Sequence, residues 1–99
     1  MIIDKTQENE KITLVIDGKL DTITAPLLQD ELIPSIDEAM RIELDFTKLS
    51  YVSSAGLRVL LLGQKTAAAK SASMILSGVS EEIMEILDIT GFVDILTIV

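Results

Sequence analysis

The chain has 99 residues, 48% of them hydrophobic, which suits one compact domain with a single core and leaves no room for a second. Sixteen acidic against eight basic residues give a formal net charge of −8. This charge disfavours nucleic acid and anionic lipid as partners, because both attract clustered lysine and arginine, so we expect a basic or mixed protein surface as the counterpart.

Histidine and cysteine are absent, which excludes Ser–His and Cys–His nucleophile pairs, disulfides, and metal sites built on imidazole or thiolate. We therefore expect no metal, no cofactor and no enzymatic activity, and the lack of cysteine fits a cytoplasmic protein. No apolar run approaches the roughly 18 residues that suggest a membrane span, so we expect no membrane insertion.

The first part of the chain predicts a hairpin followed by a helix. Residues 2–6 and 11–16 read as short strands, the second with Ile12, Leu14 and Ile16 alternating with Lys11 and Thr13, and the polar run QENE between them suits a turn. Asp17-Gly18 is expected to turn the chain again. Thr24 is expected to be the N-cap of a helix that Pro34 ends or kinks.

The second part continues as alternating strands and helices. The expected elements are a strand over 41–46, a helix from Ser53 or Ser54 to about Lys70, a strand over 73–77, a helix capped by Ser80 and reaching about Leu87, and a strand over 94–99. The order β-β-α-β-α-β-α-β predicts an α/β domain with a mixed, mostly parallel sheet and helices packed on it.

The helix after the serine pair SS sorts its residues into two faces. At 100° per residue Ser54 shares one face with Arg58, Leu61 and Lys65, and Leu62 lies about 80° away. The opposite face is expected to pack on the sheet and carries Gly56, Val59, Leu60, Gly63 and Ala67. Two leucines on or beside the polar face suggest that a partner covers a patch beside Ser54.

Two readings of Ser54 follow from the residues alone, a helix cap and a phosphoacceptor. A hydrolase nucleophile is excluded, because no G-x-S-x-G elbow and no histidine base are present. A phosphate at a helix start would meet unpaired N–H groups and the positive end of the helix dipole. It would also add about −1.5 to −2 charges to what we expect to be an already acidic face, and so disturb an interface built around the neutral hydroxyl.

The stretch DFTKLSYVSSAGLRVLL, together with the upstream GKLDTITAPLL, resembles the STAS domain of bacterial anti-sigma factor antagonists, and the resemblance covers essentially the whole chain, 1–99. In that family an anti-sigma factor that is also a serine kinase phosphorylates a serine at this helix start, and a PP2C-type phosphatase removes the phosphate. The unmodified protein binds the kinase and frees the sigma factor. The resemblance also implies a monomer when the protein is free.

Carried over by position, the resemblance makes Ser54 the phosphoacceptor, with Ser53 as the less favoured alternative at a place where relatives often carry aspartate. The loop 21–24 corresponds to the segment that lies beside the acceptor and contacts the kinase. The expected partner-binding residues are Asp21, Thr22, Thr24, Ser53, Ser54, Gly56, Arg58, Leu61, Leu62 and Lys65. A second hypothesis keeps the fold but makes the chain a non-catalytic STAS subunit of a larger lipid-transport or stress-signalling assembly, without a phospho-switch.

Overall fold

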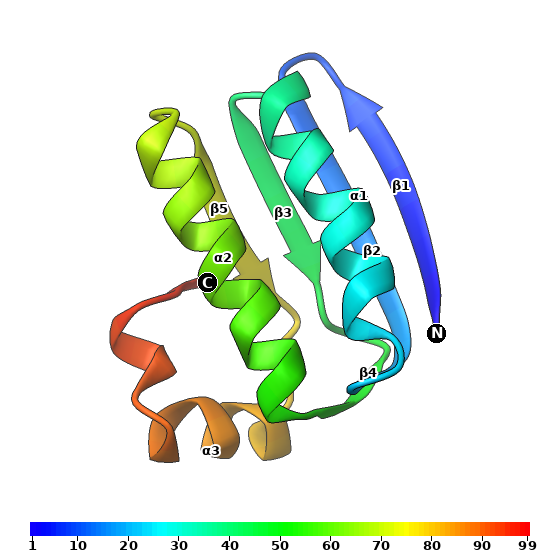
Figure 1. Ribbon diagram of the computed structural model, residues 1–99, viewed down its shortest axis with the longest axis vertical. Coiled ribbons are helices and arrows are strands. Elements are labelled where there is room, and N and C mark those ends of the chain that lie inside the picture. The colour runs from blue at the N-terminus through cyan, green and yellow to red at the C-terminus, as the bar shows by residue number, and fades with distance from the viewer.

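The computed structural model describes residues 1–99 and shows a six-stranded sheet with two long helices side by side on one face (Figure 1). In chain order the elements are β1 (Ile2–Glu8), β2 (Lys11–Leu20), α1 (Ala25–Glu38), β3 (Arg41–Asp45), β4 (Leu49–Val52), α2 (Ser54–Ala69), β5 (Ser73–Ser77), α3 (Glu81–Ile89), the short 3-10 helix η1 (Phe92–Asp94) and β6 (Thr97–Ile98). The predicted α/β class is confirmed, and α3 lies across the end of the molecule where α2 begins.

The sheet has the order β1-β2-β3-β5-β6, and β4 joins it by pairing with the end of β2. β1 and β2 are antiparallel, and all other pairs are parallel, as the order of elements predicted. β2 pairs with β3 along its first half and with β4 along its last residues. This fork brings the segment that follows β4 next to the segment that follows β2.

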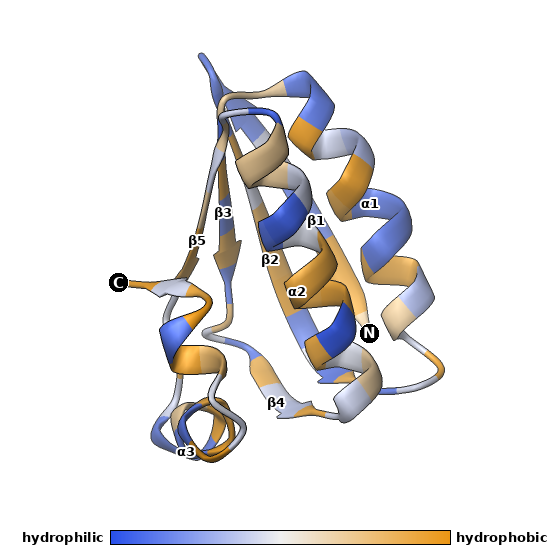
Figure 2. Ribbon diagram, turned by 60° about the vertical axis from the view of Figure 1, so that its left-hand side comes forward, coloured by the Kyte–Doolittle hydropathy of each residue, from blue (hydrophilic) through white to orange (hydrophobic).

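The core lies between the sheet and the two long helices. Every second residue is buried in β3, in β5 and in the first six residues of β2, which is the pattern of strands with one covered face. Hydrophobic and hydrophilic residues alternate along the turns of α1 and α2, as expected for helices that cover a sheet on one side only (Figure 2). The largest fully buried side chain is that of Phe46, which directly follows β3.

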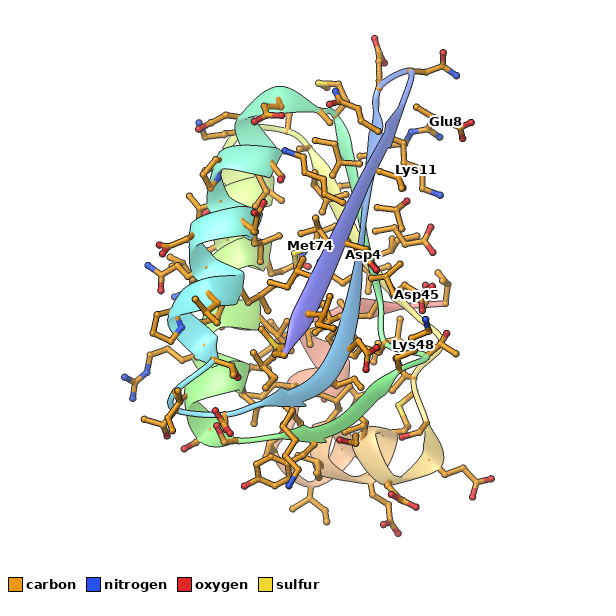
Figure 3. All side chains as sticks on the ribbon, turned by 90° about the vertical axis from the view of Figure 1, so that its right-hand side faces the viewer. Asp4, Glu8, Lys11, Asp45, Lys48 and Met74 are labelled. Atoms are coloured by element: carbon orange, nitrogen blue, oxygen red, sulfur yellow. The ribbon has the colours of Figure 1, made fainter.

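The opposite face of the sheet carries polar side chains and no helix. Figure 3 shows on that side the labelled residues Asp4, Glu8, Lys11, Asp45 and Lys48, whereas Met74 points toward the helices. On this face Lys11 Nζ lies 2.6 Å from Glu43 Oε1, and the Ser77 hydroxyl donates to Glu43 Oε2 at 2.6 Å. The hydrogen bond from Lys11, followed by that from Ser77, lowers the pKa of Glu43. These contacts tie β2, β3 and β5 together across the open face.

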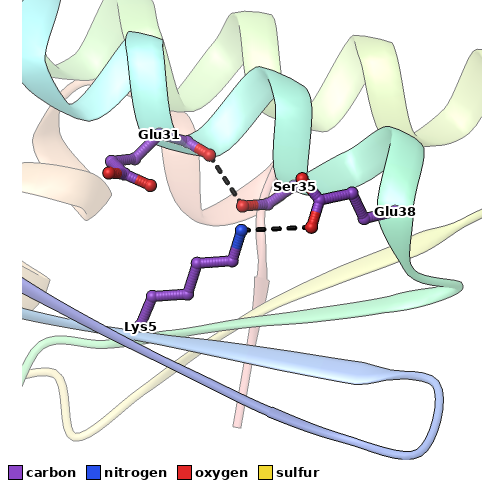
Figure 4. A network of polar contacts seen from close by, with 4 residues as sticks. All are labelled: Lys5, Glu31, Ser35 and Glu38. Atoms are coloured by element: carbon purple, nitrogen blue, oxygen red, sulfur yellow. Dashed lines mark hydrogen bonds and ion pairs between the residues drawn. The ribbon is translucent and has the colours of Figure 1, made fainter.

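α1 continues through Pro34 to Glu38, so Pro34 does not end this helix, which was one of the two predicted outcomes. Pro34 removes one N–H donor, but it lies on the exposed side, where water can satisfy the carbonyl left without a partner. The neighbouring residue Ser35 is fully buried, and its hydroxyl donates to the Glu31 carbonyl oxygen at 2.7 Å (Figure 4). Lys5 of β1 pairs with Glu38 at 3.1 Å and fastens the end of α1 to the sheet edge.

The predicted turn at Asp17-Gly18 is also wrong, because β2 continues to Leu20. Gly18 has φ +115°, and the pairing register shifts between Gly18 and Lys19, which marks an irregularity inside the strand rather than its end. The Gly18 N–H donates to the Lys48 carbonyl oxygen at 3.0 Å, where the short and unpredicted strand β4 begins. The extension of β2 thus depends on a strand thirty residues downstream.

The two ends of the chain differ from the predicted bounds. β1 reaches Glu8, so the turn of the hairpin is limited to Asn9 and Glu10 rather than the whole QENE run. At the other end the strand predicted over 94–99 is reduced to Thr97–Ile98. Gly91 takes φ +81°, and the next residues close as η1, so the chain reaches the sheet only for its last two paired residues.

Candidate functional site

The start of α2 and the loop after β2 lie together at the edge where two parallel strands end. Leu20 of β2 is in register with Val52 of β4, and the Ser53 N–H donates to the Leu20 carbonyl oxygen at 2.9 Å. The loop 21–24 and the serine pair follow directly after these two positions. The structure therefore brings together the loop 21–24 and the serine pair, the two segments predicted to contact a partner.

The two serines have different surroundings. Ser53 is the half-buried N-cap of α2; its hydroxyl accepts the Gly56 N–H at 3.4 Å, and its carbonyl oxygen accepts the Leu57 N–H at 2.9 Å. Ser54 is the first residue of the helix, is exposed, and its hydroxyl makes no hydrogen bond within the protein. The fold thus uses the side chain of Ser53 and leaves that of Ser54 free.

The predicted faces of α2 are confirmed. Arg58, Leu62 and Lys65 are exposed with Ser54, while Leu61 is half-buried. The buried residues of the helix are Gly56, Leu57, Val59, Leu60, Gly63 and Ala67. An exposed row with two cations and a leucine therefore runs from the first turn of α2 to its third.

The expectation of an acidic face around Ser54 is wrong. Residues 46–80 contain no aspartate or glutamate, and the only charged side chains there are those of Lys48, Arg58, Lys65 and Lys70. The acidic residues lie in the segments before and after this stretch, and one of them, Asp21, belongs to the loop that adjoins the start of α2. The net charge of the whole chain therefore does not describe the exposed face of α2. On the exposed face of α2 the local charge is positive.

Gly56 permits the close approach of α2 to the end of β2. A Cβ atom at this position would lie 2.7 Å from Leu20 Cγ and 3.0 Å from the Leu20 carbonyl oxygen, both shorter than ordinary contacts. Gly56 was named among the expected contact residues, but it is buried and offers no surface to a partner. It positions Ser54 by letting the first turn of the helix rest on Leu20.

The loop between β2 and α1 is held by reciprocal hydrogen bonds between Asp21 and Thr24. Asp21 Oδ1 accepts the N–H groups of Ile23 and Thr24, both at 3.0 Å. Thr24 Oγ1 accepts the Asp21 N–H at 2.8 Å and donates to the Lys19 carbonyl oxygen at 2.7 Å. Thr24 occupies the N-cap position of α1 as predicted, but its hydroxyl bonds within the loop and makes no capping hydrogen bond to the helix.

This folded loop turns Thr22 and Ile23 outward. Ile23 is 82% exposed and was not among the predicted contact residues, although an isolated isoleucine between two threonines of a polar loop is the signal that could have identified it. Leu27, in the first turn of α1, is 51% exposed. These apolar side chains lie on the segment that adjoins the start of α2.

The loop should respond to acid through Asp21. The hydrogen bond from the Thr24 N–H is the largest cause that lowers the pKa of Asp21 below its ordinary value of 3.8. A lowered pKa stabilises the folded loop above the ordinary pKa, and this contribution is lost as the pH falls through the lowered one. In an NMR titration the amide shifts of Ile23 and Thr24 should therefore move with a midpoint below 3.8.

The variant Asp21→Asn provides the control for this titration. An amide side chain keeps an acceptor oxygen but carries no charge, so the movement of these two shifts over the same pH range should disappear. An unchanged titration in the variant would show that another group causes the acid response.

No group of three or more acidic, histidine or cysteine side chains is arranged to hold a metal ion. None of the helices combines the length and the apolar character needed to cross a membrane. The arrangement at the start of α2 is instead a surface, with a free hydroxyl, two cations and exposed apolar side chains. Such a surface can bind a protein, and its hydroxyl can accept a modifying group.

Comparison with known proteins identifies a family. Residues 3–99 match the family model described as the STAS domain. The chain is 30% identical over 96 residues to the anti-sigma-B factor antagonist of Bacillus subtilis, covering 97% of this chain and 88% of that protein. It is 28% identical over 95 residues to the protein of the same name in Listeria monocytogenes, covering 95% of this chain and 83% of the relative.

Solved structures with the same fold include two forms of one protein. The unphosphorylated anti-sigma factor antagonist SpoIIAA aligns with a TM-score of 0.78 at 16% identity, over 99% of this chain and 87% of that one. The phosphorylated form of the Bacillus cell fate determinant SpoIIAA aligns with a TM-score of 0.77 at 17% identity, over 99% and 91% of the two chains. The fold of this chain is therefore about equally similar to both forms.

Proposed function

The chain belongs to the STAS domain family, and we propose that it is an anti-sigma factor antagonist that binds its partner through the face of α2 around Ser54. The observation that carries this proposal is the free, exposed hydroxyl on the first residue of α2. It lies beside a loop whose hydrogen bonds hold Ile23 outward. The relatives named anti-sigma-B factor antagonist suggest this function. The surface around Ser54 offers the place where a protein partner can bind.

In this proposal the partner is an anti-sigma factor that is also a serine kinase. The unmodified chain binds it, and the sigma factor is released because the anti-sigma factor is occupied. The partner surface would carry acidic groups opposite Arg58 and Lys65, and apolar contacts for Ile23 and Leu62. This chain contributes no catalytic group; the transfer of phosphate belongs to the kinase, and its removal to a PP2C-type phosphatase.

Phosphorylation of Ser54 would switch the interaction off without refolding the domain. A phosphate at the first residue of α2 is favoured by the helix dipole, by about 0.3–1 kcal/mol at an exposed site. Its charge of about −1.5 to −2 would offset Arg58 and Lys65, which lie on the same face, and would repel the acidic groups of the partner. A neutral hydroxyl at the centre of the interface thus becomes an anion that the partner cannot accommodate.

Ser54 is the proposed acceptor rather than Ser53. A kinase must reach the hydroxyl, and Ser54 is exposed and unbonded, whereas Ser53 is half-buried. The Ser53 hydroxyl is also already in use, because it accepts the Gly56 N–H, whereas that of Ser54 has no partner within the chain. Phosphate on Ser53 would therefore have to replace an existing cap, while phosphate on Ser54 uses a hydroxyl that the fold leaves free.

Intact mass spectrometry of the protein purified from its native host tests the switch. We expect a fraction of the chain to carry one phosphate, which phosphatase treatment removes and which fragmentation assigns to Ser54. A phosphate assigned to Ser53 would contradict the choice of acceptor. Absence of phosphate under every growth condition would contradict the switch and favour the second function, a non-catalytic STAS subunit of a lipid-transport or stress-signalling assembly.

A further inference from the structure

A groove lies between α3 and η1, outside the surface around Ser54. It is shallow and open to solvent, has a volume of about 540 Å³, and is lined by Val79, Glu81, Met84, Glu85, Asp88 and Val93. Val79 precedes α3, and Val93 belongs to η1, so the groove is bounded by the helix on one side and by the returning chain on the other. Figure 1 shows these two segments adjacent at the end of the molecule. None of the lining residues belongs to α2, so binding in the groove does not depend on Ser54.

The groove presents one stripe of α3 that the domain leaves uncovered. Glu81, Met84, Glu85 and Asp88 follow the spacing i, i+3, i+4 and i+7, which places them on the same face of a helix. The opposite face packs into the core through Ile83 and Leu87. Val79, Met84 and Val93 are half-buried, and the three carboxylates are exposed. The groove therefore combines apolar side chains with an acidic rim.

The acidic rim has no counterion within the chain. Residues 71–99 contain five acidic residues and no lysine or arginine. The three ion pairs of the structure all involve other residues, so Glu81, Glu85 and Asp88 are unpaired. Glu81 and Glu85 are also one helical turn apart, where like charges repel. Cations brought by a partner would relieve this repulsion, because carboxylates are spread over about two turns of α3.

We propose that this groove is a second docking surface, and that its occupant is a basic amphipathic helix of a protein partner. The apolar stripe of such a helix would cover Val79, Met84 and Val93, and lysine or arginine beside the stripe would face the carboxylates. The carboxylates of Glu81 and Asp88 belong to residues roughly 10 Å apart along the axis of α3, which suits cations spaced one to two turns apart. Nucleic acid and anionic lipid are excluded, because both are negatively charged.

NMR titration of the full, isotopically labelled chain with synthetic peptides tests this proposal. The probe is a lysine–leucine peptide with an amphipathic helical order, compared with the same composition in scrambled order and with a glutamate–leucine counterpart. We expect saturable shifts at the amides of Val79, Met84 and Val93 with the first peptide only. Equal binding of the scrambled peptide, or shifts centred on the Ser54 face, would overturn the proposal.

Charge-reversal variants distinguish binding of the peptide in the groove from a general attraction between opposite charges. Glu85→Lys combined with Asp88→Lys should weaken the peptide roughly tenfold, because two attractive contacts become repulsive. The matched control is Asp30→Lys with Glu31→Lys, which makes the same change in net charge on exposed positions of α1 and should alter the affinity less than about twofold. Equal weakening by both pairs would overturn the proposal.

A substitution at Met84 tests the apolar contact in the groove. Met84→Ala should weaken the peptide several-fold without changing the dependence of binding on salt, because it removes contact area and no charge. No change in affinity would contradict an apolar contact in the groove. Concentration-dependent shifts at Val79 and Val93 without any peptide would show that a second copy of this chain occupies the groove, and would overturn the proposed occupant.

Discussion

Ser54→Asp is expected to weaken binding of the anti-sigma factor kinase roughly a hundredfold, whereas Ser54→Ala should keep the affinity of the unmodified protein. A carboxylate at this position would be buried against the acidic groups that the partner places opposite Arg58 and Lys65. A loss of about 2.7 kcal/mol corresponds to a factor of one hundred. Alanine removes only a hydroxyl that makes no hydrogen bond within the chain. Isothermal titration calorimetry with the purified partner measures both affinities.

Ser53→Asp is the matched control for this experiment, because it adds the same charge one residue earlier. Aspartate is a favoured N-cap and can accept the Gly56 N–H as the serine does, so the fold of the helix start should be kept. We expect binding within a few-fold of the wild type. Equal affinities of the Asp and Ala variants at Ser54 would rule out the switch. A loss with Ser53→Asp as large as that with Ser54→Asp would show that any added anion suffices.

The features of α2 were predictable because their causes are local. The sequence placed the helix start at Ser53 or Ser54, and the cap contact that decides between them joins residues only three positions apart, with Ser53 and not Ser54 as the cap. The two faces of the helix follow from its own periodicity over residues 54–69. The same holds for α3, whose N-cap Ser80 accepts the Ile83 N–H at 3.2 Å as the sequence indicated. Elements of this kind can be predicted without knowledge of the rest of the chain.

β4 and the extension of β2 could not be predicted in this way. Each depends on the other, since Gly18 pairs with Leu49 and Leu20 with Val52 across some thirty residues of chain. β4 has only four residues and the burial pattern buried-exposed-exposed-buried, so it lacks the alternation that marks a longer strand. The sequence around Asp17-Gly18 therefore looked like a turn, although the strand passes through it.

The site was predicted in its position but not in its electrostatics. The expectation of an acidic surface came from the net charge, which is a sum over the chain, whereas the acidic residues are confined to the segments 1–45 and 81–94. The outward position of Ile23 follows from hydrogen bonds between Asp21 and Thr24 that no periodicity reveals. The exposed face of α2, which carries Ser54, is therefore locally positive, although the chain as a whole is acidic.

Gly56→Ala is expected to lower the free energy of unfolding by about 1–2 kcal/mol, measured by urea denaturation. Alanine gains up to about 1 kcal/mol of helix propensity over glycine, but its Cβ would meet Leu20 at Cγ and at the backbone carbonyl oxygen. The carbonyl oxygen is held by the strand, and Cγ belongs to a fully buried side chain with little room to rotate. The start of α2 must then shift away from β2, which strains the hydrogen bond from the Ser53 N–H to Leu20. Partner affinity should fall as well, because Ser54 moves with the helix start.

Gly63→Ala is the matched comparison, since it makes the same change in the same helix with the same gain in propensity. There the new Cβ would lie 2.6 Å from Leu32 Cδ2 and 3.0 Å from Met74 Sδ, which are the mobile ends of flexible side chains. We expect a smaller loss of stability than with Gly56→Ala, and no change in partner affinity.

If Gly56→Ala were as stable as the wild type and bound equally well, the close contact between α2 and Leu20 would not be what positions Ser54. If the two variants lost equal stability but only Gly56→Ala lost affinity, the effect on binding would come from the displaced helix start and not from the general stability of the domain.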